Sequence, residues 1–219
     1  MKIVRHGNAT PSIVLIPGGP GLVASFYNEL IEELSKSYGV VTYAQRGSYD
    51  GGMESHPTTV TEYAEELESV VAALSESAGA TILLGQSFGA AVVIEALARG
   101  VAVDGAILAN GFSSGEMLAR GLRRRREELP QEFHDRYATA GQPGGADPGE
   151  LLMTYFYPRH LCRTTPWPDS FLEGISKLNP DLLSHFLGTD LFEPEGALRN
   201  WDRDALLESI RQPVLVASG

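Results

Sequence analysis

The chain has 219 residues, of which 43% are hydrophobic and 21% charged, with a formal net charge of −11 and a single cysteine. This composition predicts a soluble globular protein, because its charged fraction is too low for a disordered chain and its apolar runs are too short to cross a membrane. The acidic balance argues against nucleic acid and anionic membranes as partners, and one cysteine excludes an internal disulfide and a cysteine-rich metal site.

Strand and helix patterns alternate in the first half of the chain. Residues 1–8 are a short basic stretch with no apolar run behind it, so we expect no secretory signal and a cytoplasmic protein. We expect residues 1–16 to supply at most about one and a half strands. The pattern predicts strands at residues 12–16, 40–44, 80–85 and 104–110, and helices at residues 24–37, 61–77 and 87–100. Because the strands are apolar throughout, we expect a parallel sheet covered by helices on both faces.

The alternation of strand and helix patterns stops after Gly111. Residues 112–200 are mostly helical in pattern, with no convincing strand, and we interpret them as a helical cap inserted over one edge of the sheet. Residues 204–210 predict a short helix and residues 213–217 a fifth parallel strand. The chain is therefore divided into a first part of an α/β core (1–111), a cap insertion (112–200) and a resumed core (201–219). The basic cluster at 123–126 is expected to be a solvated helix face.

The sequence Gly85-Gln86-Ser87-Phe88-Gly89 joins a predicted strand to a helix of small residues. In this setting the pattern G-x-S-x-G predicts a nucleophile elbow, a sharp turn that lifts a serine hydroxyl above the sheet at a helix N-terminus. Ser87 is the candidate nucleophile, and the backbone N–H of Phe88 is a candidate oxyanion donor. The alternative is a tight turn with a capping serine.

A second glycine-rich loop, Gly18-Gly19-Pro20-Gly21, follows the first long strand. Glycine lets backbone N–H groups come close to a substrate, and we expect the Gly19 N–H to be the second oxyanion donor. Gly18, Pro20 and Gln86 are expected to line the substrate pocket. For this chemistry we expect neither a metal nor a cofactor.

Together these motifs resemble those of the proline iminopeptidases, which are serine aminopeptidases of the α/β-hydrolase fold. The resemblance rests on the loop at 17–21, on Ala44-Gln45-Arg46-Gly47-Ser48, on the G-Q-S-F-G motif, and on Tyr155–Arg163, Trp167-Pro168, Asn179-Pro180 and Trp201-Asp202 in the family's order. It implies an α/β-hydrolase fold with a helical cap and release of an N-terminal residue, typically proline, from a small peptide or amide. The implied mechanism is an acyl-enzyme on Ser87.

Three positions depart from that family's pattern. The histidine before Gly-Gly is Pro17 here, and the aspartate that opens D-Q-R-G is Ala44. The cap glutamate that holds the free amine of the substrate in the family falls on Leu191, with Glu193 or Glu195 as candidate replacements. Because a buried ammonium without a partner is costly, we expect a preference for amides or esters whose amine is blocked or absent.

The acid and the histidine of the expected triad are not found where the fold would place them. The acid would follow the strand at 213–217, and the histidine would follow one more strand. Of the histidines present, only His56 is expected on the correct rim of the sheet, and Asn110 occupies the alternative position of the acid. We therefore keep three alternatives: a hydrolase completed by a longer or separate chain, a catalytically incomplete binding protein, or an esterase or amidase for non-peptide substrates.

The last predicted strand has a further implication. Val214 to Val216 are expected to form an uncovered sheet edge. Such an edge invites self-association or pairing with a complementary C-terminal chain.

Overall fold

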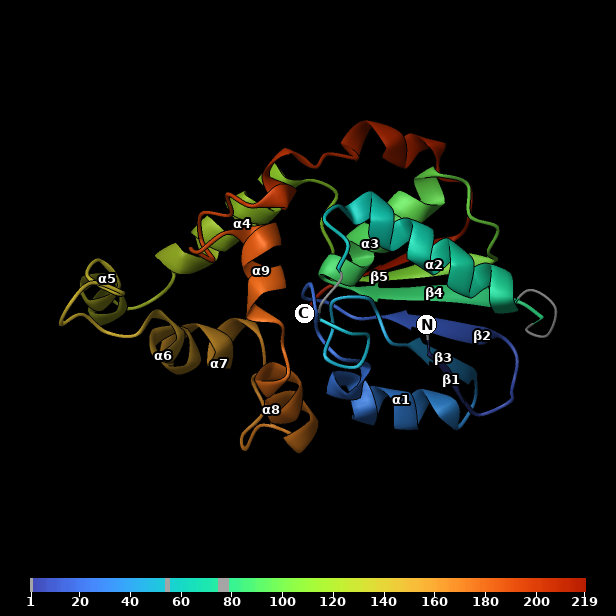
Figure 1. Ribbon diagram of the computed structural model, residues 1–219, viewed down its shortest axis with the longest axis horizontal. Helices are drawn as coiled ribbons and strands as arrows, with labels where there is room; N and C mark the ends of the chain where they lie inside the picture. The colour runs from blue at the N-terminus through green and yellow to red at the C-terminus, as the bar shows by residue number, and fades with distance from the viewer. Residues whose placement is uncertain (1, 54–55, 75–78) are drawn as a thin grey trace.

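The computed structural model describes residues 2–53, 56–74 and 79–219. A six-stranded sheet forms the centre of the core, in the order β1-β3-β2-β4-β5-β6 (Figure 1). Its strands are β1 (Ile3–His6), β2 (Ser12–Ile16), β3 (Gly39–Tyr43), β4 (Thr81–Gln86), β5 (Gly105–Ala109) and β6 (Val214–Ala217). Strand β1 pairs antiparallel with β3, and the other four pairings are parallel. The predicted mostly parallel sheet is confirmed.

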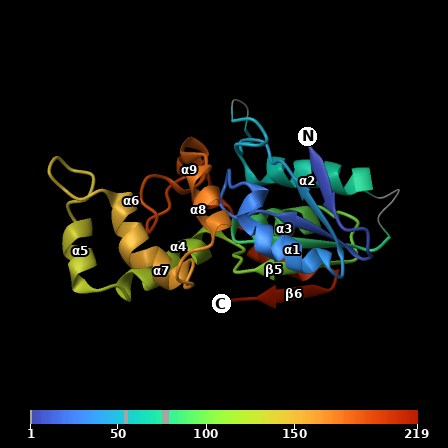
Figure 2. The same ribbon diagram turned by 90° about the horizontal axis from the view of Figure 1, so that it is seen from below.

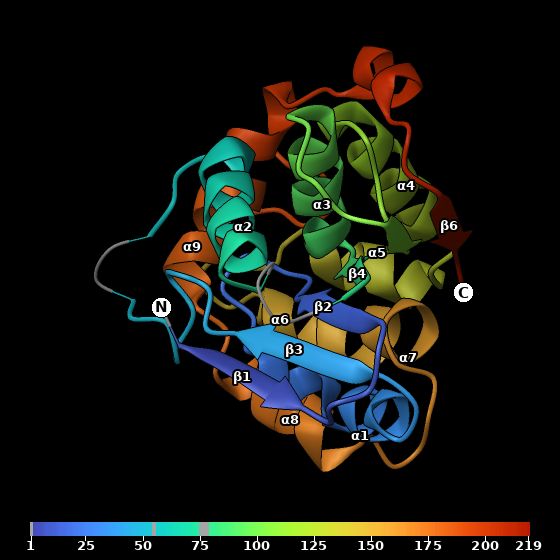
Figure 3. The same cartoon turned by 90° about the vertical axis from the view of Figure 1, so that its right-hand side faces the viewer.

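Helices cover both faces of this sheet. On one face lie the 3-10 helix η1 (Ala24–Tyr27) and α1 (Asn28–Ser35), and on the other lie α2 (Val60–Leu74) and α3 (Phe88–Ala98) (Figure 3). Successive side chains of a strand point to opposite faces, and β2 obeys this rule: Ile13 and Leu15 pack with α1, whereas Val14 and Ile16 pack with α2 and α3. Since both faces are buried, residues 13–16 of the strand are all apolar.

The N-terminal part of the chain departs from the prediction. Residues 1–16 supply two complete strands, so the expectation of one and a half was wrong. Strand β1 was missed because it is a half-buried edge strand with polar residues: Arg5 Nη1 donates to Ser12 Oγ, and His6 Nε2 lies 3.1 Å from Thr42 Oγ1. The helix predicted at 24–37 is divided between η1 and α1, and the helix predicted at 204–210 is the 3-10 helix η4 (Asp204–Ser209).

Residues 112–200 form a group of helices beside the sheet, here called the cap (Figure 1). The cap comprises α4 (Gly115–Glu127), α5 (Gln131–Tyr137), α6 (Pro148–Leu151), the π-helix η2 (Leu152–Phe156), α7 (Tyr157–His160), α8 (Asp169–Ser176), α9 (Pro180–Leu187) and the 3-10 helix η3 (Ala197–Asn200). It has an apolar cluster of its own, built around Phe133, Phe156 and Phe192. Where the predicted solvated face lies, Arg125 pairs with Glu128, but Arg126 lies over the rings of Tyr137 and Phe192.

The two ends of the cap meet at one junction. Gly115 N donates to Trp201 O at 2.8 Å, and Arg203 N donates to Ser113 O at 2.9 Å. The residues of this junction lie within three positions of the predicted cap boundaries at 112 and 200. The boundaries themselves stay a prediction. Among residues 2–53, 56–74 and 79–219, no helix is long and apolar enough to cross a bilayer.

Candidate active site

Ser87 lies at a sharp turn between a strand and a helix. Strand β4 ends at Gln86, α3 begins at Phe88, and Ser87 between them has φ 52° and ψ −116°. A positive φ is unfavourable for a residue with a side chain, so the turn is strained. It is held by hydrogen bonds from Ser87 N to Ala109 O at 2.9 Å and from Ala90 N to Ser87 O at 3.0 Å. The half-buried serine thus sits at the N-terminus of α3, as the motif predicts for an elbow.

The flanking glycines are required by close backbone contacts. A Cβ at Gly89 would lie 2.2 Å from Ile16 O, and one at Gly85 would lie 2.4 Å from Gly89 O. Real Cβ atoms do not approach backbone oxygens this closely. The elbow is therefore pressed against the end of β2, where the loop Gly18–Gly21 begins.

That loop is fixed to the elbow through Tyr27. The Gly18 N–H donates to Tyr27 Oη at 2.7 Å, and Tyr27 Oη donates to Gln86 Oε1 at 2.8 Å. The Gly18 N–H is therefore engaged. Gly19 has φ 63° and is half-buried, and no hydrogen bond of its N–H occurs among the described residues.

Two backbone N–H groups lie beside the elbow, and their role as oxyanion donors stays a prediction. Phe88 is the first residue of α3, so its N–H has no acceptor within the helix. With the Gly19 N–H it offers two donors on the two segments that meet at the elbow. Gly18 and Pro20 are buried, and Gln86 is half-buried. Their role as pocket residues stays a prediction.

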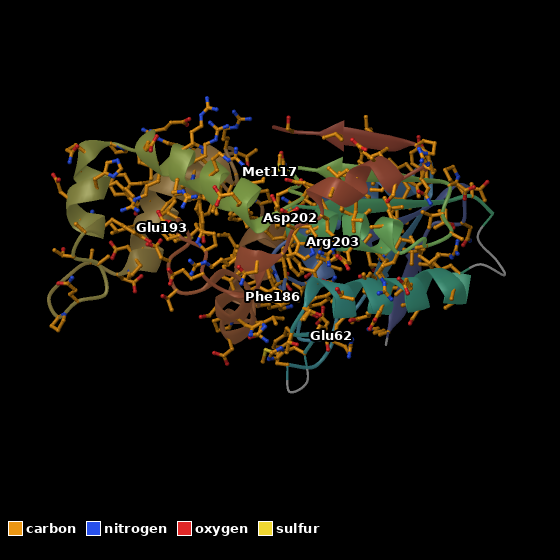
Figure 4. All side chains as sticks on the ribbon, turned by 90° about the horizontal axis from the view of Figure 1, so that it is seen from above. Glu62, Met117, Phe186, Glu193, Asp202 and Arg203 are labelled. Carbon is orange, nitrogen blue, oxygen red and sulfur yellow. The ribbon has the colours of Figure 1, made fainter. Side chains whose placement is uncertain are left out.

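The other two predicted pocket residues lie within the cap, as expected from the sequence. Leu191 packs against the apolar cluster of the cap. Glu193 pairs with Arg123, with Oε2 3.0 Å from Nη1, and lies among the cap helices in Figure 4. It also lines a pocket of about 520 Å³ together with Ser184, Gly188, Thr189, Asp190, Glu195 and Gly196. The role of Leu191 and Glu193 as pocket residues stays a prediction.

Two of the histidines, His56 and His185, make hydrogen bonds away from the elbow. His56 Nδ1 lies 3.2 Å from Pro57 O, and its ring lies 6.1 Å from the ring of His185, whose Nε2 donates to Thr58 O at 2.9 Å. In the part of the chain that the structure describes, no hydrogen bond joins Ser87 Oγ to a histidine.

Asn110 has a structural partner. Its backbone is left-handed, with φ 49°, and its Oδ1 accepts from Gly219 N at 2.9 Å. The side chain at the alternative acid position therefore holds the segment after β6.

Sequence reasoning assigned no role to two residues that organise this site. No local sequence motif marks Tyr27, because its role depends on a hydrogen bond to Gln86, 59 positions later. Asn179 could have been found, since Asn before Pro is a helix-start signal. Asn179 caps α9 and lies against the glycine loop. A Cβ on Gly21 would be 2.9 Å from the Cβ of Asn179. The neighbouring Leu178 lies beside Gly19, so the cap covers the loop.

No group of three metal-binding side chains occurs among the described residues. Besides the hydrogen-bonded Tyr27 and Gln86 side chains, the polar groups at the elbow are the Ser87 hydroxyl and backbone N–H groups. This arrangement suits nucleophilic attack on a carbonyl and stabilisation of the oxyanion that forms.

Comparison with known proteins places the chain in a family. Residues 13–176 match the model of the alpha/beta hydrolase family. The chain is 25% identical, over its whole length and 75% of the relative's, to a protein of Thermoplasma volcanium named proline iminopeptidase. It is 28% identical to one of the same name from Flavobacterium johnsoniae, with 98% of this chain and 75% of that protein covered.

A solved structure shows the same fold. The crystal structure of the proline iminopeptidase of Mycobacterium smegmatis superposes with a TM-score of 0.83 at 24% identity, over 98% of this chain and 76% of that one. The α/β-hydrolase fold predicted from the motifs is confirmed. This chain belongs to the alpha/beta hydrolase family, and the relatives described above that it resembles are named proline iminopeptidases.

Proposed function

We propose that this protein is a serine hydrolase that releases an N-terminal proline, or another N-terminal residue, from small peptides or amides through an acyl-enzyme on Ser87. One observation carries the proposal: Ser87 is held with φ 52° at the end of β4, at the N-terminus of α3. Strain of this kind persists only where surrounding contacts enforce it, and it is typical of functional sites. The relatives named proline iminopeptidase support the same class of reaction.

The chemistry follows from this placement. Ser87 Oγ bonds to the carbonyl carbon as its proton passes to a histidine base, and the carbonyl oxygen becomes an oxyanion. The N–H groups of Gly19 and Phe88 and the positive end of the α3 dipole stabilise that charge. The C–N bond then breaks, the leaving amine takes the proton, and water hydrolyses the ester. We propose that the histidine and its orienting acid come from outside these 219 residues, in a longer or a separate chain.

A fluorophosphonate probe tests this function, because it labels only an activated serine hydroxyl. We expect labelling of the native protein, none in Ser87→Ala, and unchanged labelling in Ser176→Ala, which removes an exposed hydroxyl. The intact mass of the native polypeptide, measured on the same sample, shows which chain supplies the triad. An unlabelled protein of verified mass would favour the alternative of a binding protein without turnover.

The surroundings of the cap carboxylates favour one substrate class. Glu193 is paired with Arg123, Glu195 lies 3.9 Å from Arg199, and Leu191 is apolar. The free α-ammonium group of a substrate would therefore have to compete with Arg123 or Arg199 for the carboxylate of Glu193 or Glu195. We propose that amides or esters whose amine is blocked or absent are preferred. Comparing kcat/KM for proline p-nitroanilide and its N-acetylated form tests this, and a higher value for the free amine would overturn it.

A further inference from the structure

A chain of two hydrogen bonds, here called the Tyr27 relay, connects the oxyanion loop with the elbow. It runs from the Gly18 N–H to Tyr27 Oη at 2.7 Å and from Tyr27 Oη to Gln86 Oε1 at 2.8 Å. Gly18 precedes the expected donor Gly19, and Gln86 precedes the candidate nucleophile Ser87. The relay therefore joins the immediate neighbours of the two groups that must cooperate in catalysis.

The direction of the relay is fixed by chemistry. A backbone N–H can only donate, so the Tyr27 oxygen accepts from Gly18 and its single proton must go to the Gln86 oxygen. Burial raises the pKa of Tyr27 well above its usual range, so the phenol keeps that proton at any working pH. The tyrosine is 8% exposed, so water has little access to replace it.

The relay also decides which N–H of the loop is free. With the Gly18 N–H engaged by Tyr27, the next donor along the loop is Gly19, which turns through φ 63°. Gly18 itself lies against the elbow, because a Cβ there would be 2.0 Å from Gln86 Oε1 and 2.7 Å from Gln86 O. The loop and the elbow thus have one arrangement, and Tyr27 occupies the joint between them.

The cap reaches this joint through aromatic contacts. The ring of Phe26 lies 5.0 Å from that of Tyr27 and 5.3 Å from that of Phe171 on α8. Gly174 of α8 packs on the same ring, where a Cβ would be 2.6 Å from Phe26 Cδ2. The backbone around Tyr27 is therefore held between the sheet and the cap.

We propose that Tyr27 is a positioning residue that sets the oxyanion hole, by engaging the Gly18 N–H and anchoring it to Gln86 so that the Gly19 N–H faces the developing oxyanion. The inference rests on the proposed hydrolase function. It deepens that function by assigning the geometry of the hole to a residue that contacts no substrate. An interaction of this kind acts in the transition state and leaves substrate binding almost unchanged.

The kinetic test replaces only the phenol oxygen. In Tyr27→Phe of the full-length protein we expect kcat on the preferred p-nitroanilide to fall about 10- to 100-fold, with KM unchanged within about twofold. This decrease in kcat is no larger than the decrease caused by removing a whole oxyanion donor. The fluorophosphonate labelling rate should fall in parallel. Gln86→Met breaks the same relay from its other end, and the double variant should lose no more than the worse single one.

A matched variant separates positioning from loss of stability. Tyr43 is also buried and accepts one hydrogen bond, from Gln45 Nε2 at 3.2 Å, but it lies in the core beside α2. Tyr43→Phe should lower the unfolding midpoint by a similar amount and leave kcat within about twofold. If Tyr27→Phe keeps kcat within about threefold, or if Tyr43→Phe loses as much, the proposal is wrong.

A second readout does not require turnover. Amide hydrogen exchange should show the Gly18 N–H protected and the Gly19 N–H exposed in the native protein, with Gly18 protection lost in Tyr27→Phe. Unchanged protection of Gly18 overturns the proposal even in an inactive protein. A different outcome separates the two proposals. If the native protein shows neither hydrolysis nor labelling, but protection of the Gly18 N–H still depends on Tyr27, the proposed function is wrong and the positioning of the loop by Tyr27 is retained.

Discussion

Asn179 of the cap donates a hydrogen bond of 2.8 Å from Nδ2 to the carbonyl oxygen of Gly47, 132 positions earlier in the chain. Its Oδ1 accepts from the N–H groups of Asp181 and Leu182, at 3.1 and 3.2 Å, and so caps α9. The residue is only 4% exposed. One buried amide therefore starts the cap helix and holds it to the loop after β3, and this fixes the cap above the oxyanion loop.

Two substitutions of Asn179 test these two roles. In Asn179→Asp the carboxylate still caps α9, but it has no N–H to donate to the Gly47 carbonyl. In Asn179→Ala both the helix cap and the hydrogen bond to Gly47 are lost. We expect both variants to lose about 1–3 kcal/mol in urea unfolding, because each leaves a buried polar group unpaired. Asn200→Ala, at an exposed position, should cost little. An Asp variant as stable as the native protein would show that the bond to Gly47 contributes nothing.

A buried carboxylate connects the elbow helix with the cap junction. Glu95 of α3 is 4% exposed and accepts from Arg203 Nε at 2.6 Å, Trp201 Nε1 at 3.1 Å and Thr61 Oγ1 at 2.9 Å. Burial raises the pKa of Glu95, but the hydrogen bonds from Arg203, Trp201 and Thr61 outweigh it and leave the pKa below the ordinary value of 4.5. Because the folded pKa is the lower one, this contribution to stability is present above pH 4.5 and is lost as the pH falls through the folded pKa.

Arg203→Met should reverse that dependence. Without the guanidinium, burial dominates and raises the pKa of Glu95, so the carboxylate destabilises the fold at neutral pH and the variant gains relative stability as the pH falls. We expect a loss of about 3 kcal/mol at pH 7 in urea unfolding. Arg199→Met removes an exposed ion pair with Glu195 and should cost under about 1 kcal/mol with an unchanged pH profile. Parallel pH profiles for the native protein and Arg203→Met would contradict this account.

Two glycines on helices should respond in opposite directions to alanine. At Gly89 a Cβ would lie 2.2 Å from Ile16 O, so Gly89→Ala has to push α3 away from β2 and should destabilise the protein strongly. Gly121 lies in α4 with nothing within 4 Å of the same position. Gly121→Ala should therefore raise stability by about 0.5–1 kcal/mol, since alanine restricts the unfolded chain. Thermal unfolding of the two variants side by side checks both signs.

How much of this could be predicted from the sequence depends on the range of the contacts involved. Strands β2 and β3 were predictable because burial on both faces makes most of their positions apolar. The elbow was predictable because sterics admit only glycine at Gly85 and Gly89. Strand β1 was not, since an edge strand exposes part of its surface and accepts polar residues.

The same reasoning applies to the site. Ser87, Gly19 and Phe88 follow from local motifs, whereas Tyr27 acts through a residue 59 positions away, which no local pattern contains. Leu191 and Glu193 were proposed from an alignment of the cap. The structure shows that packing and ion pairs within the cap decide where those side chains lie.

We propose that β6, an exposed edge strand in this 219-residue chain, takes part in association. Its Leu215 and Val216 are 60% and 72% exposed, and the strand pairs with β5 on one side at the border of the sheet (Figure 2). An exposed apolar edge can add a strand from another chain. We expect Val216→Lys to reduce concentration-dependent association in sedimentation, and Leu172→Lys, on the exposed surface of α8, to leave it unchanged. Equal association of the native protein and Val216→Lys would exclude this edge as the contact.

The strain at Ser87 makes a prediction that needs no substrate. With φ 52° and ψ −116°, any residue that carries a Cβ is disfavoured there, at a cost on the order of 1–3 kcal/mol. Ser87→Ala removes the hydroxyl but keeps the strain, whereas Ser87→Gly removes both. After allowing for the greater freedom of glycine in the unfolded chain, we expect Ser87→Gly to be more stable than Ser87→Ala by about 1 kcal/mol.

Ser176, the last residue of α8, supplies the opposite case. Its backbone is helical and its side chain exposed, so alanine should be more stable than glycine there by about 0.5–1 kcal/mol. Urea unfolding of the four variants gives two differences whose signs must be opposite. If glycine is the less stable substitution at both positions, the backbone of Ser87 is not strained. The elbow would then hold its serine in place without storing free energy in the turn.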